Sequence, residues 1–386
     1  MQKFSQLPNS FRDHHLIQIL MGLEQNDGPV DHFISRYFQQ HRSLGSKDRA
    51  FIAESVYTYI RWQRLIEYLC PEHNLQKKIN FLKEFDPQQY LQDPNIPPAI
   101  RLSFPEILYT LLSNHYGPEK TQEICLACNT QAPTTVRVNR AKISREQLLD
   151  KWLAEGYQVK AAEHSNDAIQ FIKKIALFSL PEFKQGLFEM QDEASQLAAG
   201  LLKVQPGEWV LDYCAGSGGK TLAFAPAMQN KGQIFLHDIR PWILTEAKKR
   251  LRRAGIQNAQ ILLPDDEKKR QSLKKKMDWV LVDAPCSGTG TLRRNPDMKW
   301  KFSEEQLQRL IGQQRTIFEK ALSFLKPAGK IVYATCSILT EENEQQIAHF
   351  CKTYGLEVEN APFATLPTKD GMDGFFATVL KKRLSS

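Results

Sequence analysis

The chain has 386 residues, 42% of them hydrophobic, and a formal net charge of +8 at pH 7. This length exceeds the ~100–200 residues of an ordinary domain, so two domains with a small third piece are expected. No apolar run approaches the ~20 residues that cross a bilayer, and residues 1–6 are not followed by an apolar signal core, which predicts a cytoplasmic protein.

The first part of the chain, residues 1–130, predicts an all-helical domain. Its clearest helix is expected to have Ser46 as its N-cap, with Asp48 in the first turn and apolar residues at helical spacing after it. Cys125 and Cys128 form a C-x-x-C pair within a predicted helix. A structural zinc site needs four ligands, and no second pair stands nearby, so these thiols are predicted to be core residues.

A small α+β piece follows the helical region. Residues 134–139 alternate like a strand, and residues 144–156 predict a helix whose capping box is Ser144 with Gln147. Two further short strands come next. We predict an adaptor subdomain over residues 131–186, packed on the domain that follows.

Strands and helices alternate through the rest of the chain, residues 187–386. Such alternation is typical of a doubly wound, mostly parallel sheet. The predicted strands are residues 209–213, 234–238, 260–263, 279–283, 331–335 and 375–380. The predicted helices are residues 193–202, 220–228, 241–254, 304–325 and 342–354.

A glycine-rich loop, residues 214–221, comes after the first strand of this region. A nucleoside triphosphate loop needs a glycine where Cys214 stands, and a dinucleotide loop needs one where Thr221 stands. S-adenosylmethionine carries no phosphate and asks only for a close glycine turn. It also needs an acid for its ribose hydroxyls at the end of the second strand, where Asp238 lies. Together with two cysteines described next, this favours S-adenosylmethionine.

Two cysteines stand just beyond two strand ends. Cys286 follows the strand that ends in Asp283, and Cys336 follows the strand at residues 331–335. Because ligands bind at the carboxyl edge of such sheets, both thiols are expected to face one substrate, with a base between them. Two small buried hydrophobic residues are the alternative, which the shared position at two strand ends disfavours.

Positive charge is concentrated in one sector, residues 246–276. This sector holds eleven Lys/Arg and four Asp/Glu. Solvated helix faces are the simpler interpretation of any one charged run. A basic sector beside a predicted active site favours a polyanionic partner, with nucleic acid as the leading candidate.

At several motifs the sequence is recognisable. They are residues 190–195 (MQDEAS), 212–221 (DYCAGSGGKT), 283–290 (DAPCSGTG) with 293–297 (RRNPD), 333–337 (YATCS) and 373–376 (DGFF). In these motifs the chain resembles the Sun (RsmB-like) branch of the Nop/Sun family of S-adenosylmethionine-dependent RNA cytosine-5 methyltransferases. The resemblance covers residues 134–383. It implies a Rossmann-like methyltransferase domain at 187–386, and the helical N-terminus is similar to a NusB-like RNA-binding domain.

The resemblance implies a role for each motif residue. Cys336 attacks C6 of cytosine, Cys286 assists product release, and Asp283 hydrogen-bonds the base. The implied cofactor-binding residues are Cys214, Ala215, Gly216, Ser217, Gly218, Gly219, Lys220, Asp238, Asp265 and Asp283, with Asp266 as the alternative to Asp265. The implied RNA-binding residues are Lys248, Arg252, Arg293, Arg294 and Asn295.

The expected partner is an RNA, with small-subunit ribosomal RNA preferred over transfer RNA as the substrate. The protein is expected to be a monomer and to bind no metal. One departure stands in the glycine loop, where Gly216-Ser217 replace the family's Ala-Pro pair. Two other functions remain open. A DNA cytosine methyltransferase would use Cys286 as its nucleophile, and a ribosome-assembly factor would bind RNA without catalysis.

Overall fold

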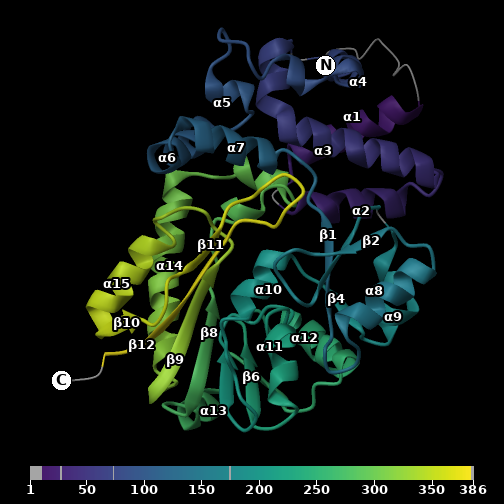
Figure 1. The fold of residues 1–386 in the computed structure, drawn as a ribbon. Helices are drawn as coiled ribbons and strands as arrows, with labels where there is room; N and C mark the ends of the chain where they lie inside the picture. The colour runs from purple at the N-terminus through teal and green to yellow at the C-terminus, as the bar shows by residue number, and fades with distance from the viewer. Residues whose placement is uncertain (1–10, 27, 73, 174, 384–386) are drawn as a thin grey trace. The chain divides into compact units, whose positions relative to one another are not determined.

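The computed structural model describes residues 11–26, 28–72, 74–173 and 175–383 (Figure 1). The prediction drawn from residues 1–6 therefore lies outside the described residues. The chain forms two compact units, one of Met1–Gln131 with Leu292–Glu304, the other of Ala132–Thr291 with Glu305–Ser386. The predicted boundaries at residues 130 and 186 stay predictions.

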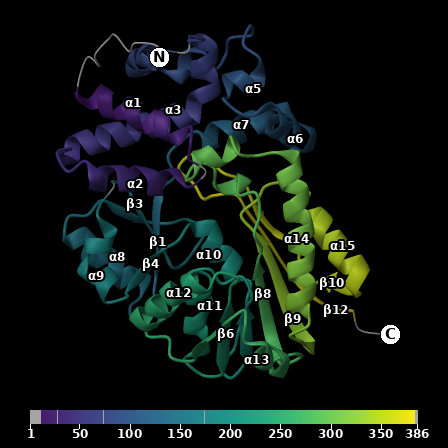
Figure 2. The same ribbon diagram turned by 180° about the vertical axis from the view of Figure 1, so that it is seen from behind.

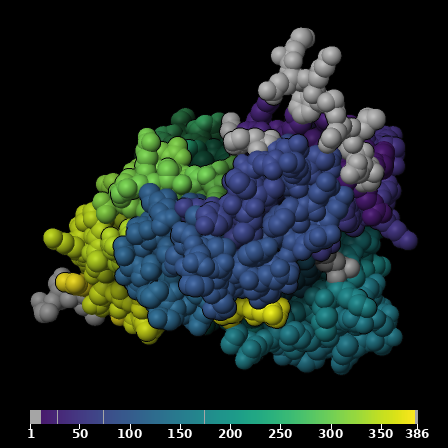
Figure 3. Space-filling model, turned by 90° about the horizontal axis from the view of Figure 1, so that it is seen from above, coloured from purple at the N-terminus to yellow at the C-terminus, as the bar shows by residue number. Residues whose placement is uncertain are grey.

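Helices make up the first unit, and its surface is seen in purple to blue in Figure 3. They are α1 (Phe11–Leu23), α2 (Val30–Gln40), α3 (Ser46–Leu69), α4 (Leu75–Glu84), η1 (Pro87–Gln89), α5 (Pro98–Arg101), α6 (Glu106–Tyr116), α7 (Pro118–Cys128) and η5 (Pro296–Lys299). The predicted N-cap of α3 is wrong by one residue. Gly45 takes the extended N-cap conformation and Ser46 is already helical, so Ser46 makes no cap. Asp48 lies in the first turn as predicted and pairs with Arg12 at 2.7 Å.

The C-x-x-C pair lies in α7, as predicted. Both Cys125 and Cys128 are buried in the helical unit. Within the described ranges, no group of three or more His, Cys, Asp or Glu residues is arranged to hold a metal ion. Because their side chains are buried, Cys125 and Cys128 are core residues of the helical unit.

A four-stranded antiparallel sheet begins the second unit. Its elements are β1 (Thr134–Val138), α8 (Arg145–Ala154), β2 (Val159–Ala161), β3 (Ala168–Phe171), η2 (Leu177–Ser179), α9 (Pro181–Lys184) and β4 (Phe188–Met190). The strand order is β2-β3-β1-β4. The predicted capping box of Ser144 and Gln147 is present at the start of α8. Strand β4 belongs to this sheet because it pairs antiparallel with β1, and its Phe188 packs edge-on against Trp152 of α8.

A larger, mixed sheet forms the rest of the second unit (Figures 1 and 2). Its strands are β5 (Trp209–Asp212), β6 (Gln233–His237), β7 (Ala259–Leu262), β8 (Met277–Asp283), β9 (Leu325–Thr335), β10 (Leu356–Val358), β11 (Phe363–Thr365) and β12 (Phe375–Lys382). The order is β10-β12-β9-β8-β5-β6-β7, with β11 paired to β12. Strands β5 to β9 pair in parallel, and β12 runs antiparallel to β9. The strand order reverses between β5 and β8, which is where open α/β sheets bind ligands.

Helices cover both faces of the larger sheet. They are α10 (Glu193–Ala199), α11 (Thr221–Phe224), η3 (Ala225–Met228), α12 (Pro241–Ala254), α13 (Glu267–Ser272), η4 (Thr289–Thr291), α14 (Glu304–Leu322) and α15 (Glu344–Tyr354). Alternate strand residues point to opposite faces. Leu211 and Val280 share one buried cluster with Phe318 of α14, whereas Val210 and Leu281 share another with α11 and α12. The predicted doubly wound, Rossmann-like sheet is thereby confirmed.

No helix in the described part of the chain is long and apolar enough to cross a membrane.

Candidate active site

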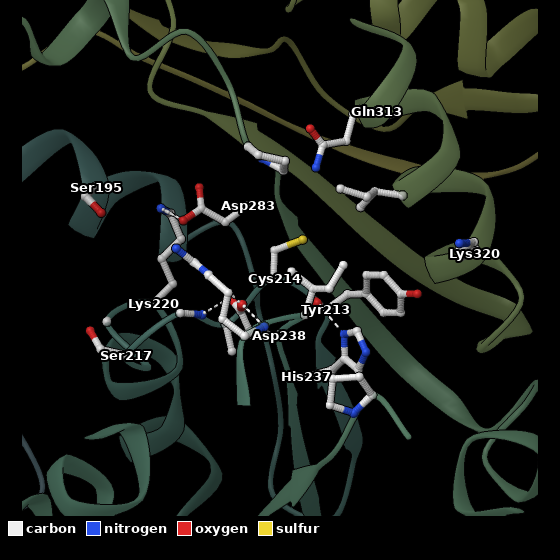
Figure 4. Close-up of a pocket in the computed structure, with 18 of the residues that line it drawn as sticks. Ser195, Tyr213, Cys214, Ser217, Lys220, His237, Asp238, Asp283, Gln313 and Lys320 are labelled. Atoms are coloured by element: carbon white, nitrogen blue, oxygen red, sulfur yellow. Dashed lines mark hydrogen bonds and ion pairs between the residues drawn. The ribbon is translucent and has the colours of Figure 1, made fainter. Parts of the chain in front are cut away.

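A cavity of about 880 Å³ lies at the carboxyl edge of the sheet, where the strand order reverses. The glycine loop, the ends of β5, β6 and β8, and one side of α14 supply its walls (Figure 4). It is lined by Met190, Gln191, Ser195, Tyr213, Cys214, Ala215, Gly216, Ser217, Gly219, Lys220, His237, Asp238, Ile239, Arg240, Arg250, Pro264, Arg270, Asp283, Pro285, Gln313, Thr316, Ile317 and Lys320. The topological switch point thus carries an open site of ligand size.

The glycine loop turns tightly against the strand ends. Gly216 and Gly218 have φ values of +52° and +81°, which non-glycine residues rarely adopt. A Cβ atom on Gly216 or Gly219 would meet no protein atom within 4 Å, although both residues line the cavity. The absence of side chains there leaves room for a ligand to approach the backbone.

Arginines hold the loop from outside. Arg250 of α12 donates to the carbonyl oxygen of Ser217 at 3.0 Å and to its Oγ at 2.5 Å. Glu189 of β4 holds Arg250 through two hydrogen bonds of 3.0 and 3.2 Å. Arg137 of β1 donates to the carbonyl oxygen of Gly219 at 3.0 Å. The small sheet therefore helps to position the glycine loop.

Asp238 stands at the end of β6 with its carboxylate directed at the loop (Figure 4). It accepts from the Gly216 N–H at 2.9 Å and from the Arg240 guanidinium at 2.9 and 3.1 Å. Burial opposes ionisation of Asp238, but the hydrogen bonds and charge of Arg240 outweigh it and lower the pKa of this carboxyl. Asp238 is thus an anionic acceptor at the rim of the cavity.

An ion pair between buried Lys220 and half-buried Asp283 joins the loop to β8. Lys220 Nζ lies 2.5 Å from Asp283 Oδ2, and the Lys220 side chain is 8% exposed. The ammonium also lies 5.1 Å from the centre of the Phe375 ring. Lys220 therefore places a fixed positive charge at the end of β8.

The two predicted thiols are in contact. Cys286 Sγ and Cys336 Sγ lie 3.3 Å apart. The prediction of a base between them is wrong for this structure, because parallel pairing brings the two strand ends too close. A hydrogen bond from Cys286 lowers the pKa of Cys336, whereas that bond, burial and the adjacent sulfur raise the pKa of Cys286. Of the two thiols, Cys286 is therefore the one that holds its proton more tightly.

Most predicted cofactor residues come together at the cavity. Cys214 to Ser217, Gly219, Lys220, Asp238 and Asp283 line it. Gly218 lies behind the lining against Ala247 and Leu236. Asp265 is exposed and outside the lining, where its neighbour Pro264 takes part, and Asp266 caps α13 instead. A turn at residues 264 and 265 follows β7, so neither acid continues the strand.

The predicted RNA-binding residues fall into separate places. Lys248 and Arg252 are exposed one turn apart on α12. Arg293, Arg294 and Asn295 belong to the helical unit instead. Asn295 is exposed, Arg294 is half-buried, and Arg293 is only 1% exposed, with its carbonyl accepting from Arg61. A role in RNA binding stays a prediction for all five.

Buried Lys299 anchors the segment Leu292–Glu304 within the helical unit. Lys299 donates to the carbonyl oxygen of Arg61 at 2.7 Å and to Asn129 Oδ1 at 2.8 Å, and Trp300 donates to the carbonyl oxygen of Ile60. Burial lowers the pKa of Lys299 to about 7. Sequence reasoning missed this lysine, as it missed Arg137, Arg250 and Glu342, because long-range partners leave no local pattern in the sequence.

A glycine loop at the switch point, an acid after the second strand and a second acid after the fourth define an S-adenosylmethionine-dependent methyltransferase. Comparison with known proteins identifies the branch. The family model "16S rRNA methyltransferase RsmB/F" matches residues 199–381, and the RsmF/B-like ferredoxin-like domain model matches residues 104–177. The ribosomal RNA small subunit methyltransferase B of Vibrio vulnificus is 32% identical over 383 residues, covering 96% of this chain and 83% of that protein. The chain belongs to the RsmB/F family of RNA methyltransferases.

Solved structures share the fold. The crystal structure of PH0851 has a TM-score of 0.79 at 21% identity and covers 99% of this chain and 100% of that one. NSun6 from Pyrococcus horikoshii, solved with the S-adenosylmethionine analogue SFG, has a TM-score of 0.67 at 21% identity over 73% of this chain and 99% of that one. The predicted family, enzyme class and cofactor are confirmed.

Replacing Asp238 by alanine is expected to weaken S-adenosylmethionine binding by ~1–3 kcal/mol, or about 5- to 150-fold, because Asp238 is the predicted acceptor for the ribose hydroxyls. Calorimetric titration of the purified protein measures the change. Asp150→Ala, the same substitution at an exposed position of α8, is the matched control. Equal affinities for both variants would remove Asp238 from the site.

Asp212 predicts a pH dependence of stability. Its carboxyl is buried and accepts from Thr221 Oγ1 at 2.7 Å, and burial raises its pKa from 3.8 to about 7. The folded protein holds this proton to about pH 7, whereas the unfolded chain releases it near 3.8, so the contribution of Asp212 falls as pH rises through that window. Asp212→Asn should therefore gain stability relative to the parent protein between pH 5 and pH 8 in urea denaturation. A pH-independent difference would contradict the burial of a protonated carboxyl.

Proposed function

We propose that this protein methylates C5 of a cytosine in small-subunit ribosomal RNA, using S-adenosylmethionine. The observation that carries the proposal is the pair of touching thiols at adjacent strand ends, next to the Lys220–Asp283 ion pair. The name of the relative from Vibrio vulnificus supports the substrate. The exposed basic residues of α12 support binding to a polyanion.

C5 of cytosine is a poor nucleophile, and the two thiols offer a way around this. A thiolate that adds to C6 gives the ring enamine character, so that C5 can accept a methyl group. The C5 proton must then leave, and the thiolate must be eliminated to free the product. One group must therefore attack C6, and another must accept the proton from C5.

We assign the attack to Cys336. The two sulfur atoms lie within hydrogen-bond distance, and both the hydrogen bond with Cys286 and the positive charge of Lys220 lower the pKa of Cys336. Burial and the carboxylate of Asp283 act in the opposite direction. The hydrogen bond makes Cys336 the better anion of the two, and a thiolate is the reactive form of cysteine.

Cys286 is assigned to product release. Its pKa is raised, so it carries a proton when the nucleophile attacks. After methyl transfer it gives this proton to solvent, and its thiolate accepts the C5 proton. The electrons of the C5–H bond re-form the C5–C6 double bond as Cys336 leaves as a thiolate. Asp283 is assigned to the base, where a carboxyl group can hydrogen-bond N3 or N4 of cytosine. Lys220 holds Asp283 in place through the ion pair.

The cavity fits S-adenosylmethionine. Gly216 and Gly219 leave open space at the backbone, and Asp238 offers an acceptor for the ribose hydroxyls. When bound, the cofactor supplies the methyl group as an electrophilic sulfonium. The proposed binding residues are Cys214 to Lys220, Asp238 and Asp283, and the helical domain is proposed to bind RNA.

An adduct-trapping experiment tests the two assignments. Cys286→Ala retains the nucleophile but lacks the releasing group, so it should accumulate a protein–RNA adduct that survives denaturing electrophoresis. Cys336→Ala should form none and be inactive. The substrate is small-subunit ribosomal RNA from cells lacking the gene, incubated with S-adenosylmethionine. Cys351→Ala, at a half-buried thiol of α15, should behave like the parent protein.

Each other outcome has a defined meaning. Adducts from Cys336→Ala alone would exchange the two roles and match the arrangement of DNA cytosine enzymes. No adduct from either variant, with normal RNA binding, would favour a non-catalytic assembly factor. Adducts with transfer RNA but not with ribosomal RNA would replace the proposed substrate.

Reversing the charge of Lys248 and Arg252 tests the basic face of α12. For each phosphate that the variant no longer binds, the slope of log affinity against log salt should fall by ~0.7–0.9. Filter binding of the same RNA across a salt series measures the slope for the Lys248→Glu, Arg252→Glu double variant. The control carries Lys160→Glu and Lys352→Glu, which are exposed on β2 and α15. Equal slopes for the two double variants would mean that Lys248 and Arg252 do not contact RNA and that this face of α12 is only solvated.

A further inference from the structure

A buried carboxylate that no step above uses lies beside the two thiols. Glu342 precedes α15 and is 0% exposed. Its Oε1 accepts from the Ser287 N–H at 2.9 Å and from Gln314 Nε2 at 2.9 Å, and its Oε2 accepts from Ser287 Oγ at 2.5 Å. These donors are neutral, so the charge is stabilised by hydrogen bonds rather than by a cation in these contacts.

These contacts anchor the loop of Cys286 on both sides. Ser287, the next residue, binds Glu342 directly, and Gln314 also donates to the carbonyl oxygen of Pro285 at 3.1 Å. The main chain of Glu342 is tied to β9 in turn, because Tyr333 OH donates to the carbonyl oxygen of Glu342 at 2.8 Å. One residue therefore connects the loop after β8 to the strand that carries Cys336.

The loop after β9 is fixed by the same region. Asn343 donates through Nδ2 to the carbonyl oxygen of Ser337 at 2.9 Å and accepts from Thr335 Oγ1 at 2.6 Å. Thr335 and Ser337 flank Cys336. Consecutive residues 342 and 343 thus position one cysteine loop each, which keeps the two sulfur atoms in contact.

The charges around the two thiols are arranged asymmetrically. The carboxylates of Asp283 and Glu342 raise the pKa of Cys336, whereas the positive charge of Lys220 lowers it. Both Cys336 and Glu342 raise the pKa of Cys286. The neighbouring Tyr333 stays protonated because burial raises its pKa. An anion bonded to the residue next to Cys286 opposes a thiolate there, and only Cys336 has a compensating ammonium among these groups.

We propose that Glu342 is a positioning residue of the two-cysteine site, which holds the Cys286 loop against Cys336 and keeps the proton of the pair on Cys286. The consequence for catalysis rests on the proposed function: Glu342 opposes a thiolate on either sulfur, Lys220 compensates for this on Cys336, and Cys336 therefore attacks as the thiolate. The arrangement of charge itself is a property of the free protein and is tested without RNA.

Glu342→Gln is the deciding variant. The amide can accept from Ser287 N–H and Gln314 through its oxygen and donate to Ser287 Oγ, which can turn to Thr289 or Ser337 at 3.2 and 3.3 Å. The substitution therefore removes charge and retains the contacts. Iodoacetamide rates at each cysteine are measured by peptide mass spectrometry from pH 6 to 10 on the full chain.

The expected result is a lower pH midpoint for alkylation of Cys286 and a fall of about tenfold in the preference for Cys336 at pH 7, which is one pKa unit. Glu344→Gln is the matched control, since its carboxylate is exposed two residues further along, and it should leave both profiles unchanged. Unchanged profiles in folded Glu342→Gln would overturn the proposal even if the adduct experiment succeeds.

A second variant keeps the proposal testable if Glu342→Gln does not fold. Glu342→Asp retains the negative charge and shortens its reach, so the preference for Cys336 should persist while methylation falls. Loss of the preference in Glu342→Asp would show that the contacts and not the charge place the proton, and would also overturn the proposal.

Discussion

The parallel pairing of β8 with β9 is the constraint on which the candidate site depends. Asp283 lies opposite Ala334 in the register, and the Ala284 N–H donates to the Ala334 carbonyl at 2.9 Å. Because both strands end at the same edge, Cys286 and Cys336 emerge side by side with their sulfur atoms 3.3 Å apart. A slip of one residue would turn the side chains of one strand to the opposite face and separate the thiols.

Burial of ionisable groups at this edge gives the site its chemistry. Lys220 and Asp283 compensate one another as an ion pair, whereas Asp212 is held next to them with its pKa raised to about 7. Glu342 keeps its place through neutral hydrogen-bond donors. Charges that are partly removed from water act more strongly on neighbouring thiols than charges in bulk water.

The glycine loop shows how this chain holds a flexible segment without the family's proline. Glycine residues lose more conformational entropy on ordering than others do, so a loop with three of them must be stabilised from outside. Arg250 donates to the carbonyl oxygen and Oγ of Ser217 and is itself held by Glu189. The small antiparallel sheet, which supplies Glu189 and Arg137, therefore helps to hold the glycine loop in place.

Local pattern and order along the chain determined much of this protein. Alternating strands and helices specified the doubly wound sheet, and the acids and cysteines at strand ends marked its functional edge. These signals are short-range, since each depends on residues within one strand and the turn after it. The contact between the thiols, the burial of Glu342 and Lys299, the arginines on the glycine loop and the displacement of Asp265 from the cavity were decided by tertiary structure. The contacts join residues far apart in the sequence, for example 28 residues for Gln314 with Glu342 and 238 residues for Lys299 with Arg61, and such pairs leave no periodicity in the sequence.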